Sequence, residues 1–403
     1  MVIKNKPPRH PRRGPSCSLI LVAIVLITAS GYVMANRETV REAIIPTPVP
    51  SPSPSATDYA ILADLSQQDG AYDQAIDYYS TAIQLDATKP ELFIRLIDLL
   101  VRQKHPEEAL KTAEQVTILA PDNDRAWLAM AAAYIANGDR LINLGDTVSA
   151  NLEYAKAASA AERALAINET ALAYAYAAGG IVLQGNADLY EQALLYADDA
   201  LALEPNNPIA RLYMGKVFEL QQADYAAAIE QYQLGIESDP TLPDLYIELA
   251  FNYYATGDTA RAINSFEDAT AVDPDSAAAY DGIAFMYLQL GQDALAIENA
   301  LEAVRLDPQM ARAHGRLGLA YFRQFNYPKA IEELEVAVEL YGEVTSPNAV
   351  FFSTLGLAYI RDSLDNCPQA VPLFQDVLTV NSLATSDAEE GIEECRRAGI
   401  GLP

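Results

Sequence analysis

The sequence predicts an all-α fold, a solenoid of stacked helical hairpins that follows one N-terminal apolar helix and a proline-rich linker. One alanine recurs at spacings of 34, 48, 36, 35, 34, 34, 34 and 40 residues, and a period near 34 is typical of stacked hairpins. Within each period, two apolar stripes of helical spacing are separated by a short break, often a glycine. With 403 residues, 51% of them apolar, the chain can bury a sizeable core. The recurring alanines are Ala75, Ala109, Ala157, Ala193, Ala228, Ala262, Ala296, Ala330 and Ala370.

A membrane anchor is expected near the N-terminus, where basic residues 1–16 precede an uncharged apolar run at residues 17–35. About 20 apolar helical residues cross a bilayer, so this run predicts a single transmembrane helix in the cell membrane. The positive charges place residues 1–16 in the cytoplasm and the repeats on the extracytoplasmic side. The alternative is a secretory signal peptide cleaved near Ala35, after which the chain would be secreted.

A proline-rich stalk is expected at residues 36–55, where proline stands at every second position from Pro46 to Pro54. Each proline ring fixes φ and removes a backbone donor, so the segment favours polyproline II over helix or sheet. At about 3.1 Å per residue, the proline-rich part would extend roughly 30 Å and hold the repeats away from the bilayer.

About nine repeat units are predicted between residues 56 and 385. A small residue, such as Ala250 or Gly318, stands twelve positions before the recurring alanine in regular units and lets the paired helices approach closely. The third unit has about fourteen extra residues and the fourth about three, so longer helices or loops are expected there. The expected boundaries are 56–89, 90–123, 124–170, 171–207, 208–242, 243–276, 277–310, 311–344 and 349–385.

A capping helix and tail are expected at residues 386–403, beginning with a capping box formed by Ser386 and Glu389. Cys367 opens the second helix of the last unit, and Cys395 lies late in the capping helix. Antiparallel packing of these helices would bring the two cysteines together, so they are candidates for a disulfide on an oxidising side of the membrane. Two packed, reduced thiols are the alternative.

The recurring positions resemble the tetratricopeptide repeat family over nearly all of residues 56–385. The resemblance rests on an aromatic residue early in the first helix, such as Trp127, and on an aromatic residue in the second helix, such as Tyr79, Tyr232 or Phe266. Small residues, alanine and proline recur at the matching positions of each unit. This resemblance implies a right-handed superhelix with a concave groove that binds protein or peptide partners.

The resemblance also indicates which first-helix positions face the groove. In the later units, these positions combine aromatic rings with arginines, which are enriched where proteins bind one another. The arginines favour a partner with an acidic segment. The alternative is that the rings pack as ordinary core. The candidate partner-binding residues are Tyr213, Phe251, Tyr254, Phe285, Arg312, Arg316, Phe322 and Arg323.

Catalysis has no support in the sequence. No HExxH, CxxC or phosphate-binding loop occurs, so no catalytic residue, metal site or cofactor is predicted. From residue 56 onward, 53 acidic side chains face 20 basic ones, which disfavours nucleic-acid binding. We therefore expect a non-enzymatic, membrane-tethered scaffold for protein–protein interaction. A structural or assembly protein of the cell envelope that acts by self-association, and an accessory subunit of a membrane enzyme, are the alternatives.

Overall fold

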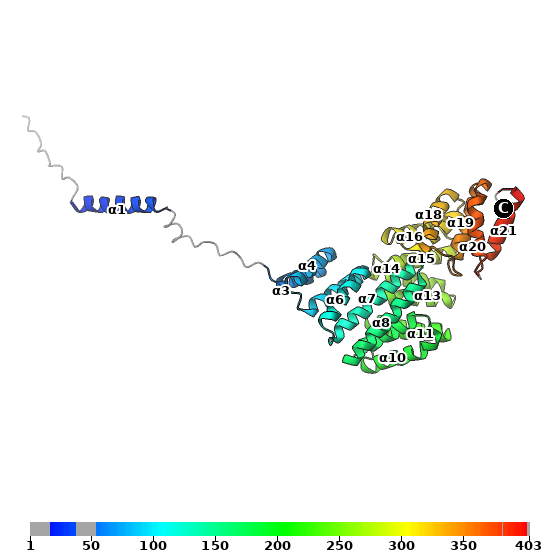
Figure 1. Cartoon of the computed structure of the whole chain (residues 1–403), viewed down its shortest axis with the longest axis horizontal. Helices are drawn as coiled ribbons and strands as arrows, with labels where there is room; N and C mark the ends of the chain where they lie inside the picture. The colour runs from blue at the N-terminus through cyan, green and yellow to red at the C-terminus, as the bar shows by residue number, and fades with distance from the viewer. Residues whose placement is uncertain (1–16, 38–53, 381, 401–403) are drawn as a thin grey trace, which may run out of the picture. The chain divides into compact units, whose positions relative to one another are not determined.

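The computed structural model describes residues 17–37, 54–380 and 382–400 (Figure 1). The chain divides into two compact units, Met1–Pro54 and Ser55–Pro403. The predicted basic N-terminus and most of the predicted stalk lie outside the described residues. In the first unit, helix α1 (Cys17–Ala35) forms over the predicted apolar run. Of the described part of the chain, no helix has both the length and the apolar character to span a membrane, so the predicted anchor is not supported.

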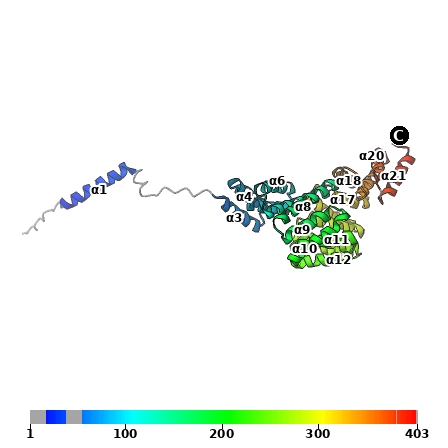
Figure 2. The ribbon, with the colours of Figure 1, turned by 60° about the horizontal axis from the view of Figure 1, so that its bottom comes forward.

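The second unit confirms the predicted all-α solenoid. Its described residues form helices and two short 3₁₀ turns, with no strand (Figure 1). The turned view shows the same succession of helices from α3 to α21 (Figure 2). The hairpins pair α3 (Ala56–Gln68) with α4 (Tyr72–Leu85), α5 (Pro90–Arg102) with α6 (Pro106–Leu119), α7 (Asp124–Asn143) with α8 (Thr147–Ile167), α9 (Ala171–Leu183) with α10 (Tyr190–Leu203), α11 (Pro208–Gln222) with α12 (Tyr225–Ser238), α13 (Pro243–Ala255) with α14 (Thr259–Val272), α15 (Ala277–Gln289) with α16 (Asp293–Leu306), α17 (Ala311–Arg323) with α18 (Tyr327–Tyr341), and α19 (Ala349–Asp362) with α20 (Cys367–Val377).

Local sequence sets where many of these helices begin and end. Asn207 caps α11 by accepting a hydrogen bond from the backbone N–H of Ala210 at 2.9 Å, and Asp258 caps α14 through the N–H of Arg261 at 3.0 Å. The break between α13 and α14 contains Gly257 with φ of 85°, a left-handed conformation that suits glycine. Lys104 occupies the corresponding break between α5 and α6 with φ of 60°.

Large side chains of one helix pack directly onto glycines of its neighbour. A β-carbon on Gly215 would lie 2.5 Å from Cε1 of Tyr232, and one on Gly356 would lie 2.5 Å from Cε1 of Phe374. These separations are shorter than carbon atoms allow, so each glycine makes room for a ring. Tyr232 and Phe374 are fully buried. The predicted small residues thus permit the close helix pairing that the sequence indicated.

The extra residues of the third hairpin lengthen both of its helices. α7 has 20 residues and α8 has 21, whereas α13 and α14 of a regular hairpin have 13 and 14. In the fourth hairpin, the extra residues form the short 3₁₀ helix η1 (Ala187–Leu189). A second 3₁₀ helix, η2 (Leu364–Asn366), precedes α20.

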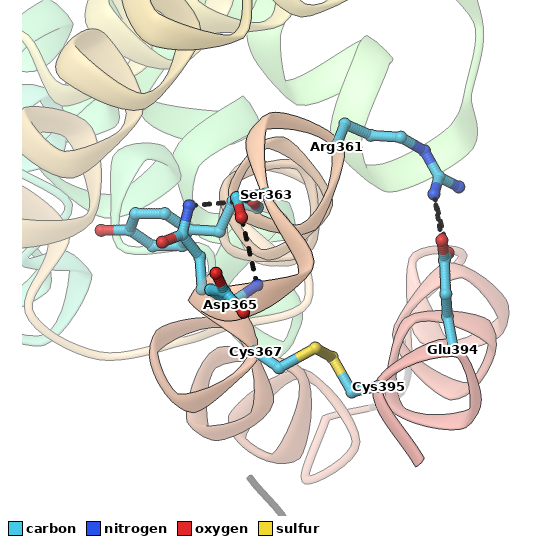
Figure 3. The surroundings of a disulfide bond; sticks show 8 residues. Arg361, Ser363, Asp365, Cys367, Glu394 and Cys395 are labelled. Carbon is cyan, nitrogen blue, oxygen red and sulfur yellow. Dashed lines mark hydrogen bonds and ion pairs between the residues drawn. A yellow bond between two sulfur atoms is a disulfide. The ribbon is translucent and has the colours of Figure 1, made fainter. Parts of the chain in front are cut away.

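The last helix, α21 (Thr385–Ala398), packs on α19 and α20. The predicted capping box is wrong, because the helix starts two residues earlier than the box requires and Ser386 lies inside its first turn. Ala384 is the N-cap residue and makes no side-chain hydrogen bond. Cys395 of α21 is joined to Cys367 of α20 by a disulfide, with 5.7 Å between the Cα atoms (Figure 3). Both cysteines are fully buried.

Candidate functional site

The first helices of the hairpins form the inner layer of the solenoid. From α5 to α19, each first helix packs on the first helix of the next hairpin, and within the described residues successive second helices show no comparable packing. Because the first helices lie closer together, the stack curves toward them. We call the inward-facing side of helices α7, α9, α11, α13, α15 and α17 the concave surface.

Two of the predicted arginines converge on one buried carboxylate. Asp281 of α15 is 1% exposed, and its Oδ2 accepts a hydrogen bond from Nε of Arg312 at 2.7 Å. Arg316 forms an ion pair with the same carboxylate and donates to the backbone carbonyl of Asp281 at 2.8 Å. A buried carboxylate requires such pairing. The two guanidinium groups are therefore engaged inside the protein, and the expectation that they stand free for an acidic partner loses its basis.

Several of the predicted rings contact one another on the concave surface. Tyr254 and Phe285 meet edge to face with 5.3 Å between ring centroids, and the guanidinium of Arg316 lies 4.7 Å from the centroid of Phe285. Phe251 packs edge to face on the buried Phe266 at 5.0 Å. Tyr254, Phe285 and Phe251 are all half-buried and pack against the core. The structure therefore combines both predictions for these rings, since each is partly core and partly accessible.

Tyr213 is a core residue, and the prediction that it faces a partner is wrong. Its side chain is 5% exposed, and its ring covers Gly179 of α9, where a β-carbon would lie 2.4 Å from Cε2. Because Gly179 has no side chain, the Tyr213 ring has room to pack inside the solenoid. Burial raises the pKa of Tyr213 well above its ordinary value.

Phe322 and Arg323 lie at the end of α17, away from the arginine pair. The half-buried Phe322 ring is tilted against Tyr327 with 5.7 Å between centroids. Arg323 donates to the backbone carbonyl of Leu288 at 2.7 Å and pairs with Asp293 at 3.1 Å. Since Arg323 already has two partners in the preceding hairpin, it too is not a free cation.

Carboxylates in the middle of the concave surface were missed by the sequence reasoning. Asp139 of α7 and Asp244 of α13 are exposed, whereas Glu248 of α13 is half-buried and pairs with Lys216 of α11 at 2.7 Å. The hydroxyl of Tyr154 donates to Asp139 at 2.8 Å. Asp244 and Glu248 occupy first-helix positions like those that gave the predicted rings, so the same positional signal could have identified them.

The pKa values of Asp139 and Asp244 are raised although both side chains are exposed to solvent. Burial among the surrounding helices raises the pKa of Asp139 to about 6, the hydrogen bond from Tyr154 opposes the shift, and the charge of Asp244 adds to it. The pKa of Asp244 is also raised, first by burial and then by Glu248. The nearby negative charges of Asp244 and Glu248 thus contribute to the raised pKa values, although the side chains of Asp139 and Asp244 remain exposed to solvent.

Metal binding has no support in the described residues, among which no group of three or more His, Cys, Asp or Glu side chains could hold an ion. His314 is buried and both ring nitrogens have partners, Nδ1 with Glu333 at 2.8 Å and Nε2 with the carbonyl of Pro308 at 3.1 Å. Burial alone would lower the pKa of His314, but these hydrogen bonds outweigh it and raise the pKa. His314 thus links α17 to α18 as a structural residue.

The fold is similar to several solved structures. Over 86% of this chain and 70% of the other, it matches the APC/C hetero-tetramer Cut9–Hcn1 with a TM-score of 0.52 and 16% identity. It matches the human IFIT1 dimer with PPP-AAAA over 86% of this chain and 91% of the other, with a TM-score of 0.59 and 16% identity. A monomeric mutant of IFIT1 with m7Gppp-AAAA gives a TM-score of 0.60 and 17% identity, over 85% and 80% of the two chains. At such identities the likeness concerns the fold alone.

Comparison with curated proteins gives no match. Two family models, both described as tetratricopeptide repeat, match this chain, one at residues 67–133 and 219–284 and the other at 180–243 and 287–343. Together they cover more than half of the chain, and the hairpins of the structure follow the same period. The chain belongs to the tetratricopeptide repeat family.

Proposed function

We propose that the chain is a non-enzymatic scaffold that binds a segment of another protein on its concave surface. Tetratricopeptide repeat proteins generally mediate protein–protein interaction, which supports the general role. The observation that carries the proposal is Asp244, an exposed residue on the concave surface whose carboxylate makes no hydrogen bond or ion pair with another described residue. The negative charge of Glu248 raises the pKa of Asp244, and a cationic partner would relieve this repulsion.

The chemistry of the concave surface favours a basic partner segment. Asp139, Asp244 and Glu248 lie near two cations, Lys216, which Glu248 already pairs, and Lys104, which contacts Asp275 and Asp273. The acidic segment expected from the arginines is less well supported, because Arg312 and Arg316 are paired with Asp281. Half-buried rings such as Tyr254 and Phe285 would supply apolar contact beside the charges.

A charge reversal on the concave surface tests the proposal. The full-length Asp244→Lys chain, cross-linked in cells and purified by affinity, is expected to lose the basic-segment partners that the unaltered chain retains, by about tenfold or more. Glu230→Lys is the matched control, since Glu230 is an exposed residue of the second helix α12. Partners that persist with Asp244→Lys, or that disappear equally with both variants, would refute the concave surface as the binding site.

The same cross-linked complexes have an expected pH dependence. Because Asp139 titrates at about pH 6, its carboxylate is charged at pH 7.5 and largely neutral at pH 5. Binding of a basic segment is therefore expected to weaken as the pH falls through 6, and Asp139→Asn should remove that part of the dependence. Identical pH profiles for both chains would exclude Asp139 from the binding surface.

We also propose that the scaffold is tethered to the cell membrane with the repeats extracytoplasmic, or is secreted after cleavage near Ala35. The basic residues 1–16 and the uncharged run at 17–35 support this location. An alkaline carbonate wash of isolated membranes should leave a tethered chain in the pellet, and recovery of the full-length chain in the wash would contradict the tether.

Cross-linking to one membrane enzyme alone would favour the accessory-subunit role.

A further inference from the structure

The tip of the lengthened third hairpin touches the end of the eighth. Gly145, between α7 and α8, has φ of 79° and lies against the ring of Tyr341, the last residue of α18. A β-carbon on Gly145 would lie 2.3 Å from Cδ1 of Tyr341. Leu141, Ile142 and Leu144 beside the tip are half-buried, although they end a hairpin that would otherwise project into solvent. The extra residues of the third unit thus reach another part of the solenoid.

Tyr341 connects this contact to the arginine pair. Its ring stacks on Phe351 of α19 with 5.9 Å between centroids and 10° between planes. Burial raises the pKa of Tyr341 to about 12, and the charges of Arg312 and Asp281 also act on it. Because Tyr341 is largely buried and stacks on Phe351, it offers the tip a fixed surface.

A second contact joins the same two parts of the solenoid. Nζ of Lys104, in the break between α5 and α6, donates to the backbone carbonyl of Asp275 at 2.5 Å and lies 3.5 Å from Oδ2 of Asp273. These acceptors stand between α14 and α15. The second and third hairpins are therefore tied to the sixth, seventh and eighth hairpins at two separate points.

We propose that these two contacts form a latch that holds the superhelix closed, and that opening it widens the concave surface. The reason is geometric, because each contact joins hairpins that are not neighbours in the stack, and repeats in a solenoid otherwise contact only their neighbours. Each contact is small. Gly145 contributes no side chain, and the Lys104 ammonium is exposed, so water competes for its acceptors. The latch is independent of whether the partner is basic or acidic.

Spin labels in the full-length chain measure the latch directly. Cysteines are introduced at the exposed positions Val148 on α8 and Glu339 on α18, with Cys17→Ser to remove the other thiol. The unaltered chain is expected to give one narrow distance distribution. Gly145→Ala should shift it to longer distances and broaden it, because the added β-carbon collides with Tyr341. Gly185→Ala is the control, since Gly185 also has positive φ, 68°, but has no atom within 4 Å.

The Lys104 contact gives a second, independent test. Lys104→Met is expected to broaden the same distribution, whereas Lys111→Met should not, because Lys111 is at an exposed position of α6 and contacts no acceptor among the described residues across the solenoid. This pair keeps the latch testable if Gly145→Ala does not fold. Distributions for Gly145→Ala and Lys104→Met that superimpose on that of the unaltered chain would overturn the proposal. Equal broadening by Gly185→Ala would also overturn it, because backbone strain would then suffice.

Discussion

Replacing Phe266 by alanine is expected to lower the free energy of unfolding by about 3 to 5 kcal/mol. Phe266 is a fully buried residue of α14. Its ring packs on Phe251 of the same hairpin, with 5.0 Å between ring centroids. It also covers Gly282 of the next hairpin, where an added β-carbon would lie 2.3 Å from Cε1 of Phe266. Because glycine has no side chain that could move into the vacated space, the cavity cannot close without a shift of α15.

The loss of stability caused by Phe266→Ala is expected to be confined to the neighbouring hairpins, so a measurement that resolves individual helices is needed. A solenoid is held by contacts between adjacent repeats, and long repeat arrays need not unfold in one step. Hydrogen exchange should therefore show the largest loss of protection in α13, α14 and α15, accompanied by a lower urea midpoint. Leu290→Ala is a control in the adjoining turn, because Leu290 is 46% exposed and its loss should change stability by less than about 0.5 kcal/mol. An effect of Phe266→Ala no larger than that of Leu290→Ala would contradict the packing described.

The regular part of the fold could be predicted because it depends on contacts within one period. The residue that packs at the centre of a hairpin, such as Tyr232 or Phe266, stands four positions after the recurring alanine and is buried in the structure. The glycine that accommodates a ring, such as Gly215, lies in the same hairpin as its Tyr232. The spacing of apolar residues and the position of the small residues within each period therefore predict how the two helices of a hairpin pack.

The candidate site could be predicted less well, because several side chains there depend on a residue of another hairpin. Nothing near Arg316 in the sequence indicates that Asp281, one unit earlier, would be buried beneath it. Tyr213 turned inward because of Gly179 in the preceding hairpin. The contact between Gly145 and Tyr341 joins units that the repeat period alone does not bring together. Position within a repeat predicts which side chains face inward, but neighbours decide which remain free.

Loss of the disulfide between Cys367 and Cys395 is expected to lower the stability of the C-terminal end by about 3 to 4 kcal/mol, on the loop-entropy account. The cysteines are 28 residues apart, and both are fully buried among side chains of α19, α20 and α21. Arg361 and Glu394 form the nearby ion pair at 2.6 Å (Figure 3). As a partly exposed pair it contributes about 0 to 1 kcal/mol, too little to hold α21 alone.

Reductant should therefore increase hydrogen exchange in α20 and α21 of the full-length chain while leaving α13 to α15 unchanged, because stability in a repeat array is transmitted mainly to neighbours. The Cys367→Ala/Cys395→Ala chain is expected to match the reduced protein and to be insensitive to reductant, which separates the disulfide from other effects of the reagent. Alkylation of both cysteines without prior reduction would show that the thiols are free. The disulfide fixes α21 to α20, which the ion pair between Arg361 and Glu394 would not do alone.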